Sequence, residues 1–142
     1  MPGQVLRGNG QQFAALPLMR QEGQVCVMLV TSRGTGRWVL PKGWAEEKLS
    51  GPEVAAKEAF EEAGILGTVK PVVLGTYSYL KQMPKDRTVT CKVDVIAMST
   101  DRLLEDWPER EQRIRQWFSL SEAAEKVQEG DLSLLLRRLA AP

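Results

Sequence analysis

Histidine is absent from the 142 residues of this chain. Its absence excludes Ser-His-Asp triads, phosphohistidine intermediates and zinc sites built on imidazole. A general base in this protein must therefore be a carboxylate, a lysine, a tyrosine, a cysteine or a metal-bound water. The composition favours chemistry carried by carboxylates and a metal ion.

Cysteine and long apolar runs are also scarce. The two cysteines, Cys26 and Cys91, each lie in an apolar, strand-like run without metal-ligand spacing, so we expect buried free thiols. No apolar run is long enough to cross a bilayer, and the polar, glycine-rich start does not resemble a signal peptide. These features predict a cytoplasmic protein without membrane contact.

The net charge is only +1, although 26% of the residues are charged, so nothing drives the chain toward nucleic acid. The length is near the common size of one domain, and no repeat or linker divides the sequence. We therefore expect a single domain over residues 1–142, with residues 1–11 as a loose leader.

Alternating and continuous apolar runs predict most of a sheet. Val89, Cys91, Val93, Val95 and Ala97 occupy one face of a long strand. Ser121 and Asp131 mark the starts of two C-terminal helices. The pattern predicts a mixed α/β sheet covered on both faces, with strands at residues 13–19, 24–31, 38–40, 68–80, 87–98 and 113–118.

One helix is unusually acidic. Ser50 with Glu53 forms a capping-box pattern at its start, and Gly64 is a natural stop. Between them Glu58, Glu61 and Glu62 share one face, beside an apolar arc made by Ala56, Ala59, Phe60 and Ala63. Bunched carboxylates destabilise a helix by a few tenths of a kcal/mol per pair. They are explained either by a bound Mg²⁺ or Mn²⁺ or by a solvated acidic face.

The surrounding residues resemble the Nudix box, G-x5-E-x7-R-E-U-x-E-E-x-G-U, in which U is aliphatic. Gly43, Glu58, Glu61, Glu62, Gly64 and Ile65 match without a gap, and Ala59 fills a U position. Two positions depart from the box, because Leu49 replaces its first Glu and Lys57 replaces its Arg. Because both positions change together, the sequence suggests that one ion pair between the loop and the helix has been lost.

Later residues resemble the diphosphoinositol polyphosphate phosphohydrolase-like branch of the family. The resemblance implies the Nudix α/β/α sandwich, with the Nudix helix on one side of the sheet and the C-terminal helices on the other. It also implies a pyrophosphohydrolase that depends on Mg²⁺ or Mn²⁺ and acts on a phosphorylated small molecule. Its matching segments are 31–33, 37–38, 104–107 and Arg113-x-Arg115-x-Trp117-Phe118.

The same resemblance assigns roles to individual residues. Glu58 and Glu62 would be metal ligands, and Glu61 would bind metal or act as the base toward water. The backbone carbonyl of Lys42 would be a further ligand. Ser32, Arg33 and Arg113 match positions that contact substrate phosphates, and Arg37 and Lys92 are additional candidates for that contact.

The substrate stays open at this stage. The segment before the first strand, Gly10-Gln11-Gln12-Phe13, lacks the basic cluster of branch members that take inositol pyrophosphates. Diadenosine polyphosphates or another nucleotide anhydride are thus comparable candidates. Trp44 is the tryptophan best placed to line the site, whereas core packing is expected for Trp38 and Trp117. The alternatives to an enzyme are a Nudix-fold sensor that binds without hydrolysis and, with no supporting feature, a protein-interaction domain. A homodimer is possible in each case.

Overall fold

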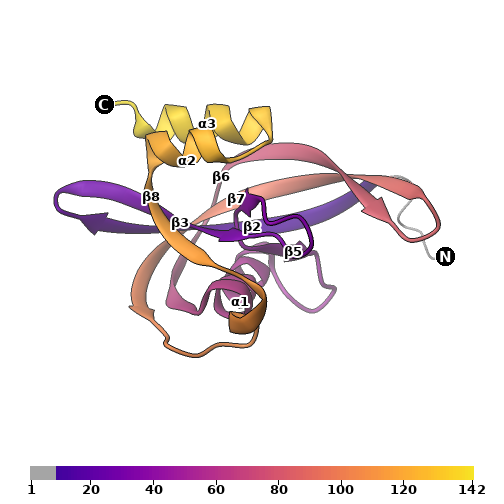
Figure 1. The fold of residues 1–142 in the computed structure, drawn as a ribbon, viewed down its shortest axis with the longest axis horizontal. Helices are drawn as coiled ribbons and strands as arrows, with labels where there is room; N and C mark the ends of the chain where they lie inside the picture. The colour runs from indigo at the N-terminus through magenta and orange to yellow at the C-terminus, as the bar shows by residue number, and fades with distance from the viewer. Residues whose placement is uncertain (1–8) are drawn as a thin grey trace.

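The computed structural model describes residues 9–142, which form one mixed sheet with helices on both faces (Figure 1). The strands are β2 (Asn9–Gln21), β3 (Gln24–Thr31), β4 (Trp38–Val39), β5 (Lys42–Trp44), β6 (Ile65–Met83), β7 (Arg87–Leu103) and β8 (Arg115–Ser119). The helices are α1 (Gly51–Ala63), α2 (Leu120–Lys126) and α3 (Gly130–Ala140), with a short 3-10 helix, η1 (Arg110–Gln112). None of these described helices is long and apolar enough to cross a bilayer.

The main strand order is β4-β3-β2-β7-β6, while β5 pairs with β2 and β8 pairs with β3. β2 and β7 run parallel, and the other described pairs are antiparallel. Figure 1 shows α1 on one side of the sheet and α2 with α3 on the other. Two separate buried clusters fill the layers between the sheet and these helices. The predicted α/β/α sandwich is confirmed.

Several boundaries differ from the sequence-based expectation. Residues 9–11 of the expected leader belong to β2 and pair with residues 90–92 of β7, whereas residues 1–8 lie outside the described part. The first C-terminal helix is capped by Ser119, not Ser121, and ends at Lys126. Strand β5 was not expected, because three residues around Gly43 carry no periodic signal. Its pairing with β2 comes from tertiary structure.

Helix α1 begins and ends as its sequence predicts. The Ser50 side chain accepts a hydrogen bond from the Glu53 amide while the Glu53 carboxylate accepts one from the Ser50 amide. Gly64 ends the helix in the left-handed conformation, at φ 65°. Phe60, expected on the buried arc, is instead 37% exposed. Cys26 and Cys91 are buried and free, as predicted.

The last turn of α1 is held by two residues from distant segments. Arg115 donates hydrogen bonds to the carbonyls of Ala63 at 2.8 Å and Leu104 at 2.7 Å. Its guanidinium stacks on the Trp107 ring at 4.0 Å from the centroid, and Trp107 Nε1 donates to the carbonyl of Glu62 at 3.1 Å. Because α1 has no basic residue in its own last turn, Arg115 supplies the cation that the negative end of the helix dipole favours.

Trp107 and Arg115 together form a clamp on the last turn of α1, and Gly64 leaves the space that they occupy. Replacing Gly64 therefore tests the clamp. A Cβ at Gly64 would lie 2.7 Å from Trp107 Cδ2 and 2.8 Å from Arg115 Nη1. We expect Gly64→Ala to lower the free energy of unfolding by about 3 kcal/mol, from left-handed strain plus steric overlap. Gly23→Ala is the matched control, since Gly23 also has positive φ but nothing lies within 4 Å of its added Cβ. Urea denaturation giving equal losses for both variants would contradict the clamp.

Candidate active site

Two of the three box glutamates, Glu58 and Glu62, lie one helical turn apart and face the same cavity. Glu62 is only 6% exposed, and burial together with a hydrogen bond shared with Glu58 raises its pKa to about 8. Burial also raises the pKa of Glu58, which is half-buried. In the metal-free protein near neutral pH, the pair therefore retains a proton that a cation could replace.

Strand β5 brings backbone against this pair. A Cβ on Gly43 would lie 2.5 Å from both Cδ and Oε2 of Glu58, so the carboxylate occupies space that only glycine leaves free. The peptide between Lys42 and Gly43 thus runs beside the Glu58 carboxylate. A hard divalent cation prefers this kind of oxygen-rich setting of carboxylates and backbone carbonyls.

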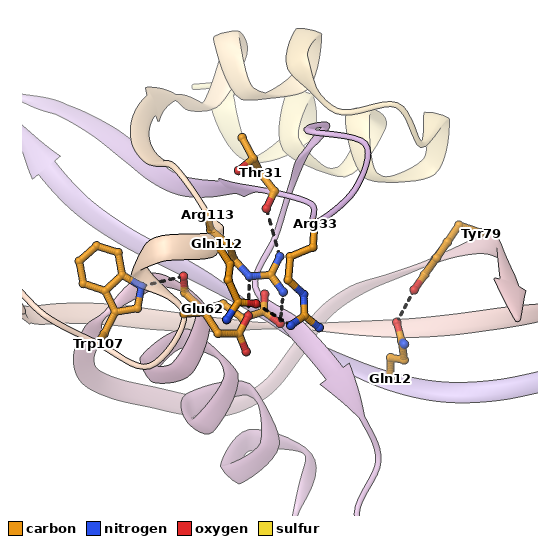
Figure 2. Close-up of polar contacts among 9 residues, drawn as sticks. Gln12, Thr31, Arg33, Glu62, Tyr79, Trp107, Gln112 and Arg113 are labelled. Atoms are coloured by element: carbon orange, nitrogen blue, oxygen red, sulfur yellow. Dashed lines mark hydrogen bonds and ion pairs between the residues drawn. The ribbon is translucent and has the colours of Figure 1, made fainter. Parts of the chain in front are cut away.

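Arg113 is a buried partner of Glu62 (Figure 2). Its Nη2 lies 3.5 Å from Glu62 Oε2, its Nε donates to Glu109 at 2.7 Å, and its Nη1 donates to the carbonyl of Thr31 at 3.1 Å. The Arg113 side chain is 8% exposed. All three nitrogens have protein acceptors, so Arg113 orients Glu62 and stabilises its ionised form. Arg113 also lines the cavity, and its expected contact with substrate phosphate stays a prediction.

The carboxylate pair opens on a cavity of about 490 Å³. Most of the candidate residues from the sequence line it, namely Ser32, Arg33, Lys42, Glu58, Glu62 and Arg113. Arg33 reaches from the turn after β3 and donates to Gln112 at 2.8 Å (Figure 2). The Ser32 hydroxyl accepts from the Arg37 amide at 3.0 Å and so stabilises the turn that carries Arg33.

Three candidates lie outside the cavity lining. Arg37 is paired with Glu129 at 3.3 Å, and Glu129 also precedes α3. Lys92 is exposed on β7, on the sheet face opposite to the buried Cys91 and Val93. Glu61 is half-exposed, and its backbone carbonyl accepts from the Glu109 amide at 3.0 Å. The sequence suggested that these three residues lie near the site, but it could not show which way their side chains point.

The sequence did not single out part of the cavity wall. Gln12 and Tyr79 line it, and Tyr79 Oη donates to Gln12 Oε1 at 2.8 Å (Figure 2). Lys42 contributes its side chain as well as its backbone, with Nζ 5.1 Å from the centroid of the Tyr79 ring. Burial lowers the pKa of Lys42. Trp44 lines the cavity as expected, whereas Gln12 and Tyr79 carried no local signal in the sequence for a place in this wall.

The two departures from the Nudix box prove less disruptive than the sequence suggested. Lys57 forms an ion pair with Glu46 in the loop before α1. The loop is therefore still tied to the helix, with the acidic partner three positions earlier than Leu49. The sequence suggested that one ion pair between loop and helix is lost, but the structure shows that the Lys57–Glu46 pair replaces it.

The fit for a metal ion rests on few side chains. Within residues 9–142, no group of three or more acidic, cysteine or histidine side chains is arranged to hold one. The residues that could hold a cation are Glu58 and Glu62, with the backbone at Lys42 and Gly43 beside them. Mg²⁺ suits such a site, because it usually keeps several waters and takes only one or two carboxylates.

The other expected tryptophan roles are seen directly. Trp38 packs edge-on against Phe118 with ring centroids 5.0 Å apart, and Trp117 packs against the buried cluster under α1. Both therefore belong to core packing, as predicted. Trp107 belongs to a family-like segment of the sequence, and its role at the end of α1 comes from the tertiary structure.

Comparison with known proteins agrees with this geometry. The sequence model of the NUDIX domain matches residues 9–138. Nudix hydrolase 12, a mitochondrial protein of Arabidopsis thaliana, is 36% identical over 70% of this chain and 50% of its own length. Human diphosphoinositol polyphosphate phosphohydrolase 3-alpha is 34% identical over 81% of this chain and 68% of its own length. The chain thus spans only about half of the first of these relatives.

Solved structures share the fold at low sequence identity. The Ap4A hydrolase of C. elegans in a binary complex superposes with a TM-score of 0.68 at 17% identity, covering 92% of this chain and 94% of that one. The MutT protein of Methanosarcina mazei gives a TM-score of 0.65 at 20% identity, covering 95% of each chain. The domain match, the relatives and the fold together show that this chain belongs to the Nudix hydrolase family.

Proposed function

We propose that this protein is a Mg²⁺-dependent hydrolase of phosphate anhydride bonds in a small phosphorylated substrate. The observation that supports this most is the pair formed by the buried Glu62 and the half-buried Glu58 beside the backbone of β5, which lines a cavity of about 490 Å³. Two carboxyl groups that share a proton away from bulk water favour replacement of that proton by a cation. A bound Mg²⁺ would neutralise charge on the anhydride and make a coordinated water more acidic.

The chain's own residues supply position and charge. Glu58 and Glu62 provide the ligand oxygens, and Arg113 orients Glu62. Arg33 and Lys42 line the cavity with cationic groups suited to phosphate oxygens. Such positioning and electrostatic stabilisation account for most of the catalysis in phosphoryl transfer. Glu61 retains the role that the box pattern gives it, a base or further ligand at the last turn of α1.

The substrate candidates are diadenosine polyphosphates, other nucleotide anhydrides and diphosphoinositol polyphosphates. Human diphosphoinositol polyphosphate phosphohydrolase 3-alpha supports the inositol candidate by its name and its 34% identity. The lack of a basic cluster in residues 10–13, which belong to β2, favours the nucleotide candidates. A screen of all three classes with and without Mg²⁺ tests the proposal.

A binding protein without turnover is the second candidate function, because Leu49 and Lys57 depart from the box. The ion pair between Lys57 and Glu46 argues against it, since the loop stays attached to α1. Products released from any anhydride only with Mg²⁺ present would favour the enzyme. Ligand-induced thermal stabilisation without product would favour the sensor.

Removal of single carboxylates tests the assignment of the glutamates. Glu58→Gln and Glu62→Gln are each expected to reduce Mg²⁺-dependent turnover at least about 100-fold, since each loses a ligand charge. The box pattern gives Glu61→Gln the same expectation. Glu125→Gln, on the exposed face of α2, is the matched control and should keep parental turnover. Turnover and circular dichroism are measured on each purified variant, and parental turnover in a folded Glu variant removes that residue from the mechanism.

The raised pKa of Glu62 makes the affinity for Mg²⁺ depend on pH. Below its pKa of about 8 the carboxyl holds a proton that must leave before a cation binds, so Mg²⁺ affinity should rise with pH and level off above about pH 8. We expect a rise of up to about 10-fold per pH unit between pH 6 and pH 8, measured by the Mg²⁺ dependence of thermal stability. In Glu62→Gln this rise should be largely lost. A flat profile in the parent protein would contradict the assignment.

A further inference from the structure

A second hollow of the molecule lies near the C-terminal end of β2, whereas the cavity at the carboxylates contains Gln12 near the start of that strand. It lies between the turn that joins β2 and β3, the start of α2, the end of α3 and the middle of β6, and its volume is about 540 Å³. Figure 1 shows the β2–β3 turn and the C-terminal end of α3 at the same end of the molecule. We call this hollow the distal groove. Within the described chain it shares no lining residue with the cavity.

An irregularity in β6 leaves the floor of the distal groove open. Between Val69 and Val73 the register of β6 against β7 shifts, so that residues 70–72 bulge opposite the single residue Ala97. Such a bulge bends the strand and changes the direction of its side chains. Ala97 therefore lines the groove with only a methyl group, and Lys70 lies at the edge of the groove.

The lining of the distal groove is mainly apolar and is continuous with the core. Leu18, Val25, Leu74 and Leu139 line it and pack, partly buried, against the core cluster under α2 and α3. The surface that they leave exposed would be removed from water by an apolar ligand, which is favourable. The volume is within the range of about 300 to 1,000 Å³ that is usual for small-molecule sites. The groove thus has the size and the surface of a site for a ligand with an apolar body.

The charged groups at the distal groove have one sign. Among the described residues, Arg20 and Lys70 are the charged members of its lining, and both are exposed. Arg20 Nη1 donates to the carbonyl of Gly23 at 3.2 Å, which holds the guanidinium beside the groove. Neither cation belongs to an ion pair within residues 9–142. The groove is therefore complementary to an anion, and a guanidinium suits a carboxylate because it can donate two parallel hydrogen bonds to it.

We propose that the distal groove binds an organic carboxylate with an apolar chain, of the size of a medium-chain fatty acid. The chain lies on the leucines of the groove, and the carboxylate is held by Arg20 and Lys70. A purely ionic ligand such as phosphate would leave the leucines exposed, and a neutral apolar ligand would leave both cations without a partner. The inference does not depend on the proposed hydrolase function, because the groove and the cavity share no lining residue.

Calorimetry with three small probes tests both the apolar and the charged part of this site. Octanoate is the amphipathic anion, hexanoate is its shorter homologue, and 1-octanol is its neutral counterpart. We expect octanoate to bind at least about 3-fold more tightly than hexanoate, because two further CH₂ groups leave water. It should bind about 10-fold more tightly than 1-octanol, which lacks the charge. Equal affinities within either pair, or no binding of octanoate, overturn the proposal.

Variants of the groove locate the binding site. The double variant Arg20→Gln with Lys70→Gln should weaken octanoate binding about 10-fold and leave 1-octanol binding unchanged. Arg87→Gln, at the exposed start of β7, is the matched control for loss of a charge outside the groove and should bind octanoate as the parent does. Ala140→Trp adds a large side chain at the exposed rim and should abolish binding without disturbing the core. Parental octanoate binding in the double variant or in Ala140→Trp, with the fold checked by circular dichroism, overturns the assignment.

Sedimentation velocity separates this ligand site from a contact between two copies of the chain. The parent and Ala140→Trp proteins are compared at equal concentration, with and without octanoate. An oligomeric state that Ala140→Trp leaves unchanged supports the ligand site. A dimer that the parent forms and Ala140→Trp does not would show that a second copy covers the distal groove, and this result overturns the proposal.

Discussion

The burial of one carboxyl group, that of Glu62, shapes the structure around it. A carboxylate that is 6% exposed is costly unless it is neutralised by a proton, an opposite charge or a metal ion. Arg113 supplies the opposite charge, and because Arg113 is itself buried it needs Glu109 and the carbonyl of Thr31 as further acceptors. The 3-10 region and the end of β3 are thereby fixed relative to α1. The site is held by a connected set of charges.

The last turn of α1 needs a second restraint, because its sequence alone provides no cation there. Trp107 binds the carbonyl of Glu62, and Arg115 binds the carbonyls just beyond it. The two residues come from the segment after β7 and from β8, so the position of the acidic residues depends on strands far away in sequence. On the other side Gly43 lets β5 approach the Glu58 carboxylate. The carboxylates are thus fixed from two directions, which suits a site that must be preorganised.

Local signals in the sequence were sufficient where a feature depends on neighbours along the chain. The capping box at Ser50, the stop at Gly64 and the buried face of β7 follow from hydrogen-bonding chemistry and strand alternation. Local signals failed where a long-range partner decides the outcome. Strand β5 exists through its pairing with β2, and Arg37 is paired with Glu129 and does not line the cavity. Likewise Lys57 forms its ion pair with Glu46, a position that the Nudix box pattern does not include.

The amino-acid sequence by itself determined the chemistry that is possible: no imidazole, an acidic helix bounded by a cap and a glycine, and the family to which the chain belongs. Only the tertiary structure decided which carboxylates line one cavity, which arginine is paired with Glu62, and that Trp44 and Tyr79 share a cavity wall with Gln12. The physical reason is that residue type and spacing fix what a group can do. Burial and the direction of a side chain depend on strands and helices brought together from distant parts of the chain.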